Sequence, residues 1–134
     1  MAKRVLVTDD EAPLRELVRG VLEEEGYEVI TAPDGQTCLF EVVSRHPDLL
    51  VLDVMMPGMT GLEVLQVLRQ RPRTKDLPVV MLTSLASDVD VLRGWLTGAD
   101  CYLTKPFDPA ELVLVVNRMV ETGPAADQEE ASRD

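Results

Sequence analysis

The sequence is poor in cysteine, histidine and basic residues, and each scarcity argues against a class of protein. Two cysteines among 134 residues are too few for a disulfide framework. The 13 lysines and arginines are outnumbered by 24 aspartates and glutamates, which gives a formal net charge of −11. This charge argues against nucleic acid as a direct ligand, because binding it requires cations that neutralise phosphates. One histidine and two separated cysteines do not offer the ligands that zinc prefers.

Long apolar runs are also missing. No stretch approaches the roughly 20 apolar residues that a membrane-spanning helix needs. The basic start Met-Ala-Lys-Arg is followed by an apolar run of only three residues, which is too short for a signal peptide. We therefore expect a cytoplasmic protein without a membrane partner. A hydrophobic content of 46% is sufficient for the core of one domain of this length.

Short apolar runs alternate five times with segments of helical periodicity. The predicted strands are Val5–Thr8, Glu28–Ala32, Leu49–Asp53, Val79–Thr83 and Cys101–Thr104. The predicted helices are Pro13–Glu25, Gln36–Arg45, Gly61–Gln70, Val89–Leu96 and Pro109–Glu121. The third and fourth strands are apolar almost throughout rather than alternating, which is typical of parallel strands covered by helices on both faces. Because helical crossovers between parallel strands are right-handed, the pattern predicts an α/β fold with a doubly wound, five-stranded parallel sheet, (βα)5.

The composition changes to glycine, proline, alanine and acid from Gly123 onward. We therefore expect a domain over residues 1–122 and a disordered acidic tail, or the beginning of a linker, over residues 123–134.

The polar residues that follow the predicted strands gather at one edge of the sheet, because ligands of open parallel sheets bind at the carboxyl ends of the strands. These residues are Asp9-Asp10-Glu11, Asp53, Thr83-Ser84 and Lys105-Pro106. Each alone has an ordinary structural explanation, such as helix capping for an aspartate after a strand. Together, three crowded carboxylates repel one another unless a cation sits among them. Ligands that are all oxygen favour a hard ion, which predicts Mg²⁺ (or Mn²⁺).

The same residues predict phosphoryl chemistry. A carboxylate can attack a phosphoryl donor and form an aspartyl phosphate. The reaction needs a metal to neutralise the phosphoryl oxygens and a further cation for the remaining charge. Asp9 and Asp10 would supply the metal site beside Asp53, Lys105 would supply the cation, and Thr83 would offer a hydroxyl to a phosphoryl oxygen.

Four motifs occur in order, each at a strand end, and together they resemble the receiver domain of two-component response regulators. The motifs are Asp9-Asp10, the segment Asp53–Gly61, Thr83-Ser84 and the segment Gly98–Phe107. The resemblance extends from Lys3 to about Glu121. It implies the flavodoxin-like fold of chemotaxis regulators, with the strand order 2-1-3-4-5.

The resemblance also implies a role for individual residues. Asp53 would be the phosphoacceptor, with Mg²⁺ held directly by Asp10, Asp53 and the backbone carbonyl of Met55, and through water by Asp9. The residues implied to contact the phosphoryl group or to switch with it are Thr83, Ser84, Lys105 and Tyr102. The Lys105–Pro106 peptide would be cis.

The resemblance implies roles for two further sets of residues, one in the lifetime of the aspartyl phosphate and one in partner binding. Met55 and Leu85 would flank the water that hydrolyses the aspartyl phosphate, and since both are apolar we expect slow hydrolysis. The interaction face on the fourth and fifth helices would include Val91, Leu96, Val113, Leu114 and Val115. The segment Leu112–Val116 is entirely apolar, and at 100° per residue it cannot all face the sheet.

The expected function is a phosphorylation-activated signalling switch, which catalyses only its own phosphorylation and slow dephosphorylation and is not a metabolic enzyme. Its expected partners are a sensor histidine kinase or phosphotransfer protein, and a downstream protein or a second copy bound through helix 4, strand 5 and helix 5. No output motif follows Glu121, so we expect either a single-domain regulator acting on a protein partner, which we favour, or a part of a longer chain.

Two rival functions are weaker. A resemblance to aspartyl phosphohydrolases would require an Asp-x-Asp pattern that begins at the nucleophile. In this sequence the residue two positions after Asp53 is Met55. A degenerate receiver acting as a static interaction domain is disfavoured by the complete set of five site residues.

Overall fold

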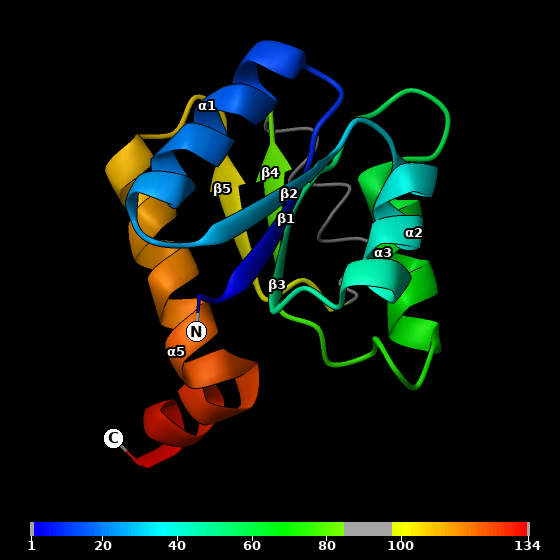
Figure 1. Ribbon diagram of the computed structural model, residues 1–134. Coiled ribbons are helices and arrows are strands. Elements are labelled where there is room, and N and C mark those ends of the chain that lie inside the picture. The colour runs from blue at the N-terminus through cyan, green and yellow to red at the C-terminus, as the bar shows by residue number, and fades with distance from the viewer. Residues whose placement is uncertain (1, 85–97, 134) are drawn as a thin grey trace.

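The computed structural model describes residues 2–84 and 98–133. Its elements are β1 Arg4–Thr8, α1 Ala12–Glu24, β2 Glu28–Ala32, α2 Gly35–Arg45, β3 Leu49–Asp53, α3 Gly61–Gln70, β4 Val79–Thr83, β5 Cys101–Thr104 and α5 Pro109–Arg133. The five strands form one parallel sheet in the order β2-β1-β3-β4-β5. Figure 1 shows α1 and α5 on one face of this sheet, and α2 and α3 on the other. The predicted doubly wound α/β fold is confirmed.

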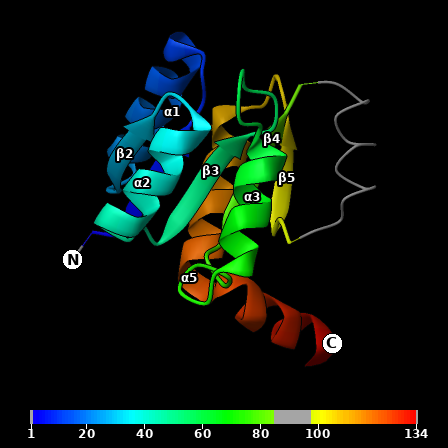
Figure 2. The same ribbon diagram turned by 90° about the vertical axis from the view of Figure 1, so that its right-hand side faces the viewer.

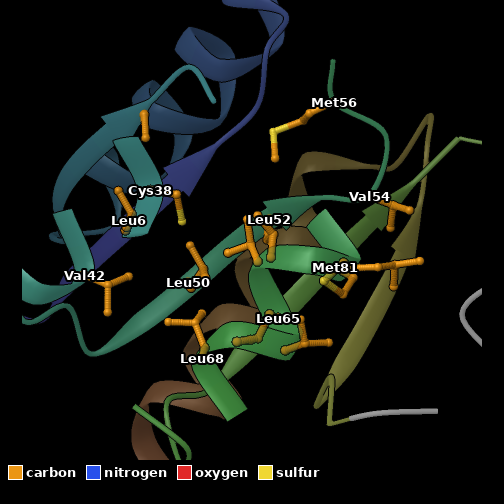
Figure 3. Close-up of a cluster of buried hydrophobic side chains, with 14 of the residues drawn as sticks. Leu6, Cys38, Val42, Leu50, Leu52, Val54, Met56, Leu65, Leu68 and Met81 are labelled. Atoms are coloured by element: carbon orange, nitrogen blue, oxygen red, sulfur yellow. The ribbon is translucent and has the colours of Figure 1, made fainter. Parts of the chain in front are cut away.

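The core consists of two layers because successive residues of each strand point to opposite faces. Leu6, Leu50 and Met81 face α2 and α3, in the cluster drawn in Figure 3. Their strand neighbours Val5, Val51, Val80 and Leu82 belong to the cluster on the side of α1 and α5. All these side chains are fully buried. Apolar residues at the first four positions of β3 and β4 are therefore the direct consequence of a sheet covered on both faces.

Local capping fixes where the helices on the second face begin. The Asp34 side chain accepts from the Thr37 N–H at the start of α2. Thr60 and Glu63 form a reciprocal capping box at the start of α3, since each side chain accepts from the other residue's N–H. A Cβ atom on Gly61 would lie 2.1 Å from the Asp53 carbonyl oxygen, so only glycine allows α3 to start this close to the end of β3. Figure 2 shows α3 and β3 side by side.

The boundaries differ from the sequence prediction at five element ends. β1 begins at Arg4, one residue before its predicted start, and α1 ends at Glu24, one residue before its predicted end. α1 begins at Ala12 and α2 at Gly35, each one residue before the predicted start. α5 continues to Arg133 instead of ending at Glu121, so the tail expected to be disordered is helical in the structure. The alanines and glutamates after Pro124 favour a helix, whereas Gly123 and Pro124 disfavour one. The predicted helix Val89–Leu96 lies outside the described residues.

Candidate functional site

The chemically active residues come from the ends of neighbouring strands. Asp53 is the last residue of β3 and Thr83 the last of β4, while Asp9 and Lys105 directly follow β1 and β5. Because β1, β3, β4 and β5 are consecutive and parallel in the sheet, these ends lie at one edge. The tight turn from Thr8 to α1 adds Asp10 to the group.

Three carboxylates meet at this edge. Asp9, Asp10 and Asp53 each offer an oxygen that lies within 4.8 Å of the other two. Asp9 and Asp53 are almost fully buried, and Asp10 is exposed. The site is therefore open to solvent from the side of Asp10.

Lys105 is the cation of the cluster. Its Nζ lies 3.2 Å from Oδ2 of Asp9 and 3.2 Å from Oδ1 of Asp53, and 3.8 Å from Oε1 of Glu11. Only 12% of its side chain is exposed. Burial lowers the pKa of Lys105, but the carboxylates of Asp53 and Asp9 outweigh this effect and hold the pKa above its usual value.

Burial is the main reason that the pKa of Asp53 rises to about 7, and the neighbouring charge of Asp9 adds to it. The ammonium of Lys105 opposes the rise without cancelling it. When all three aspartates are ionised, Lys105 balances only one of their charges, and a divalent cation would balance the other two. The oxygen-only donor set suits Mg²⁺. The residues present thus fit the metal predicted from the sequence.

Asp9 is held in place through its backbone as well as its side chain. Its N–H donates to the Ala32 carbonyl at 3.2 Å, and its Oδ1 accepts from the Glu11 N–H at 2.9 Å. The Arg15 guanidinium donates to the Asp9 carbonyl at 2.7 Å. The two backbone bonds fix the main chain at Asp9, and the carboxylate cannot turn away from the cluster without breaking its bond to the Glu11 N–H.

The Thr83 hydroxyl, like that of Thr8 at the end of β1, is a buried polar group without a hydrogen-bond partner among the described residues. The Thr83 side chain is completely buried. Buried hydroxyls are normally hydrogen-bonded, so an unpaired one at a strand end beside a carboxylate cluster points to a ligand. On the other side of Asp53, the Met55 N–H donates to Asp53 Oδ1 over a long 3.4 Å.

Comparison with known proteins agrees with this geometry. The family model described as the response regulator receiver domain matches residues 5–117. The chain belongs to this family. It is accordingly the receiver domain of a two-component response regulator, as the four motifs predicted.

Similar proteins in the receiver family are transcriptional and chemotaxis regulators. The phosphate regulon transcriptional regulatory protein PhoB of Klebsiella pneumoniae is 47% identical, and the DNA-binding response regulator MtrA of Mycolicibacterium paratuberculosis is 45% identical. Each match covers 84% of this chain and 49% of the relative, so the chain spans about half the length of these curated relatives.

Solved structures share the fold. The chemotaxis protein CheY4 of Vibrio cholerae superimposes with a TM-score of 0.81 at 36% identity, and covers 88% of this chain and 98% of its own. A putative response regulator from Chloroflexus aurantiacus gives a TM-score of 0.83 at 37% identity, over 90% of this chain and 98% of its own.

The structure places most of the predicted receiver residues. It brings Asp9, Asp10, Asp53 and Lys105 together, and the Lys105–Pro106 peptide is cis as expected. Ser84 is exposed beside Thr83, and 42% of Tyr102 is exposed on β5. Leu85, Val91 and Leu96 lie outside the described residues. On α5, 70% of Leu114 is exposed, while Val113 and Val115 are half-buried.

Glu11, which the sequence placed at this edge without a role, contributes a carboxylate near Lys105. One residue of the receiver site, Arg15, was not predicted. Arg15 secures the Asp9 backbone from the first turn of α1. A cation at that place in a helix has no distinguishing sequence signal, because it is common on any exposed helix.

Among the residues that the structure describes, no helix of the receiver domain combines the length and apolar character needed to cross a bilayer.

Proposed function

We propose that this receiver domain accepts a phosphoryl group on Asp53 from a sensor histidine kinase or phosphotransfer protein, and that the aspartyl phosphate changes its protein-binding face. The observation that carries the proposal is the buried carboxylate of Asp53, in contact with Lys105 and within 4.8 Å of two further carboxylates. Among the described residues, the polar partners of the Asp53 side chain are Lys105, the Met55 N–H and Asp10. Burying an acid against other acids costs stability and is typical of a functional site.

In the proposed reaction, an oxygen of the ionised Asp53 carboxylate attacks the phosphorus of a phosphohistidine. The new oxygen–phosphorus bond forms as the nitrogen–phosphorus bond breaks, and the leaving imidazole takes up a proton from solvent. Lys105, already 3.2 Å from Asp53, compensates charge on the transferred group. The buried Thr83 hydroxyl can then donate to a phosphoryl oxygen.

The metal belongs to this proposal. Asp10, Asp53 and the Met55 carbonyl would hold Mg²⁺ (or Mn²⁺) directly, and Asp9 through water. When bound, the ion neutralises charge on the phosphoryl oxygens. Such a cation would also favour the ionised form of Asp53, whose pKa burial raises, and the ionised carboxylate is the nucleophile.

Partners and output follow from the same proposal. The switched face would comprise the fourth helix, β5 and α5, and would bind a downstream protein or a second copy of the chain. The domain would act on itself alone, without turning over a metabolite, and would work in the cytoplasm. PhoB and MtrA are named as a transcriptional regulator and a DNA-binding regulator. This acidic receiver chain would itself make no direct contact with DNA.

Intact-mass measurement after incubation with acetyl phosphate tests the proposal. We expect a gain of one phosphoryl group with Mg²⁺, and none in EDTA. Asp53→Asn should abolish the gain, whereas Asp76→Asn, which removes an exposed acid far from the cluster, should not. Phosphorylation that persists in Asp53→Asn would remove Asp53 as the acceptor. A domain that never gains mass would instead be a static interaction module.

A further inference from the structure

An apolar hollow lies at the end of the molecule opposite Asp53. It is situated where α2 ends and where the loop from α3 reaches β4, at the amino ends of β3 and β4. Its walls include the side chains of Val42, Val43, Pro47 and Leu77. Its volume is about 170 Å³. A cavity of about 150 Å³ accommodates a benzene ring, so this hollow has room for one leucine- or phenylalanine-sized side chain.

Exposed apolar side chains extend the hollow along α2. Val43 forms part of its wall and is still 55% exposed, and Phe40, one turn earlier on the helix, is 65% exposed. The chain has only two phenylalanines, and one of them lies in water here. Single exposed apolar residues are ordinary on a protein surface. Because Phe40 and Val43 continue the apolar hollow, the three together form a larger apolar surface that a binding partner could cover.

The same end of the molecule carries unpaired positive charge. Arg71, Arg73 and Lys75 are exposed in the loop after α3, and Arg73 lines the hollow. No carboxylate oxygen of the described residues lies within ion-pair distance of any of the three. Asp76 follows them, and its charge acts on Arg69. In a chain of net charge −11, three cations at alternate positions of one loop, none in an ion pair with a described side chain, indicate that the occupant of this surface is acidic.

We propose that this α2–α3 surface, defined as Phe40, Val43, the hollow and the cations Arg71, Arg73 and Lys75, docks an acidic protein segment that inserts one apolar side chain. The apolar hollow favours a protein over a nucleic acid, because a phosphate backbone gains nothing from it. The surface lies at the strand ends opposite the carboxylate cluster, so docking is independent of the phosphorylation state of Asp53. The proposal does not rest on the chemistry proposed for Asp53.

Selection of random peptides displayed on phage tests the proposal without assuming a sequence. Peptides are selected on the full chain, and their binding is then compared on the chain with both Phe40→Ser and Arg73→Glu. We expect peptides that lose at least tenfold in affinity on the double variant to carry aspartate or glutamate next to leucine, isoleucine or phenylalanine. Their affinity for the wild type should fall with salt and should be unchanged by Asp53→Asn.

Matched substitutions elsewhere separate this surface from general stickiness. Leu114→Ser removes an equally exposed apolar side chain on α5, and Lys3→Glu reverses an exposed charge at the N-terminus. Neither should reduce binding of the selected peptides, and thermal unfolding should show that all variants remain folded. Selected peptides without acidic enrichment, or with equal affinity for the double variant, overturn the proposal. Sedimentation showing a dimer that Arg73→Glu dissociates would also overturn it, since a second copy would then be the occupant.

Discussion

At Asp53, three physical effects act on one carboxyl group with different signs. Burial and the charge of Asp9 favour the protonated form, and Lys105, 3.2 Å away, favours the ionised form. Burial and the charge of Asp9 outweigh the effect of Lys105 and place the pKa of Asp53 at about 7. The native state of the metal-free protein therefore binds a proton that the unfolded chain, with a carboxyl pKa of about 4, releases at much lower pH.

The pKa values of Asp53 in the native and unfolded states determine whether the free energy of unfolding rises or falls with pH. Between the unfolded pKa and about pH 7 the native state binds more protons than the unfolded state, so the free energy of unfolding falls as the pH rises. We predict that the titration of Asp53 lowers the unfolding free energy of the metal-free domain by about 1–3 kcal/mol between pH 5 and pH 8. Lys105 does not contribute in this window, because its raised pKa gives stability that is lost only at alkaline pH.

Urea unfolding in EDTA across this pH range measures the effect. Asp100, whose pKa burial also raises, gives a slope of the same sign, so the informative quantity is the difference between wild type and Asp53→Asn. The variant should show a flatter pH profile, and saturating Mg²⁺ should flatten the wild-type profile in the same way. Parallel profiles of the two proteins in EDTA would show that Asp53 is ionised throughout.

α5 shows how one helix divides an apolar sequence between core and surface. Leu112 and Val116, four residues apart on one helical face, are fully buried against the sheet. Leu114, between them, is 70% exposed, and Val115 packs only partly against the core. Five consecutive apolar residues on one helix must include some that face away, and the structure identifies Leu114 as the one most exposed.

The same substitution at two of these positions should have very different effects. Leu112→Ala should cost about 2–4 kcal/mol of unfolding free energy, because it leaves a cavity in the core. Leu114→Ala should change it by less than about 0.5 kcal/mol. Chemical denaturation of both variants measures the two values. A large loss for Leu114→Ala would mean that its side chain is buried in solution, by a second copy or by another part of the chain.

The ends of the helices and strands show which features of the fold the local sequence could predict and which it could not. The strands were predicted almost to the residue, since β-branched and leucine runs between turn residues leave little choice. The end of α5 was not, because Gly123 and Pro124 favour a stop while the alanines and acids after them favour continuation. The network at the start of β5 was not predicted either. There Arg69 donates to the Gly98 carbonyl and contacts Asp100, residues far from it in sequence.

Across the whole molecule, sequence predicted the site better than the surfaces. The order of motifs at strand ends was enough to bring Asp9, Asp10, Asp53 and Lys105 to one edge, because a parallel sheet aligns all its carboxyl ends. The α2–α3 surface had no comparable signal. Its apolar and basic parts come from α2 and from the loop after α3, and only the packing of these elements makes them adjacent.

The site and the outer strand of the sheet are linked through the β4–β5 pair. Thr83 and Thr104 are register partners at the ends of these strands, and Tyr102 is the residue of β5 paired with Met81. The Thr83 hydroxyl is buried and has no hydrogen-bond partner within residues 2–84 and 98–133, and Tyr102 is 42% exposed. A group bound to Asp53 that accepts from the Thr83 hydroxyl would displace this side chain toward the site. The space beside it would then be open to Tyr102.

Beryllofluoride, which imitates an acyl phosphate on Asp53, tests this link in solution. The chain has two tyrosines, so 3-fluorotyrosine labelling gives two fluorine NMR signals. We predict that Mg²⁺ with beryllofluoride shifts the Tyr102 signal. The signal of Tyr27, whose hydroxyl contacts Asn117 on α5, should stay in place and serve as an internal reference.

Thr83→Val keeps the side-chain shape but removes the hydroxyl, and should abolish most of the Tyr102 shift while beryllofluoride still binds. If Tyr102 responds equally in Thr83→Val, the signal reaches β5 by a route that does not involve the Thr83 hydroxyl. If Tyr102 does not respond in the wild type, β5 does not take part in the switch.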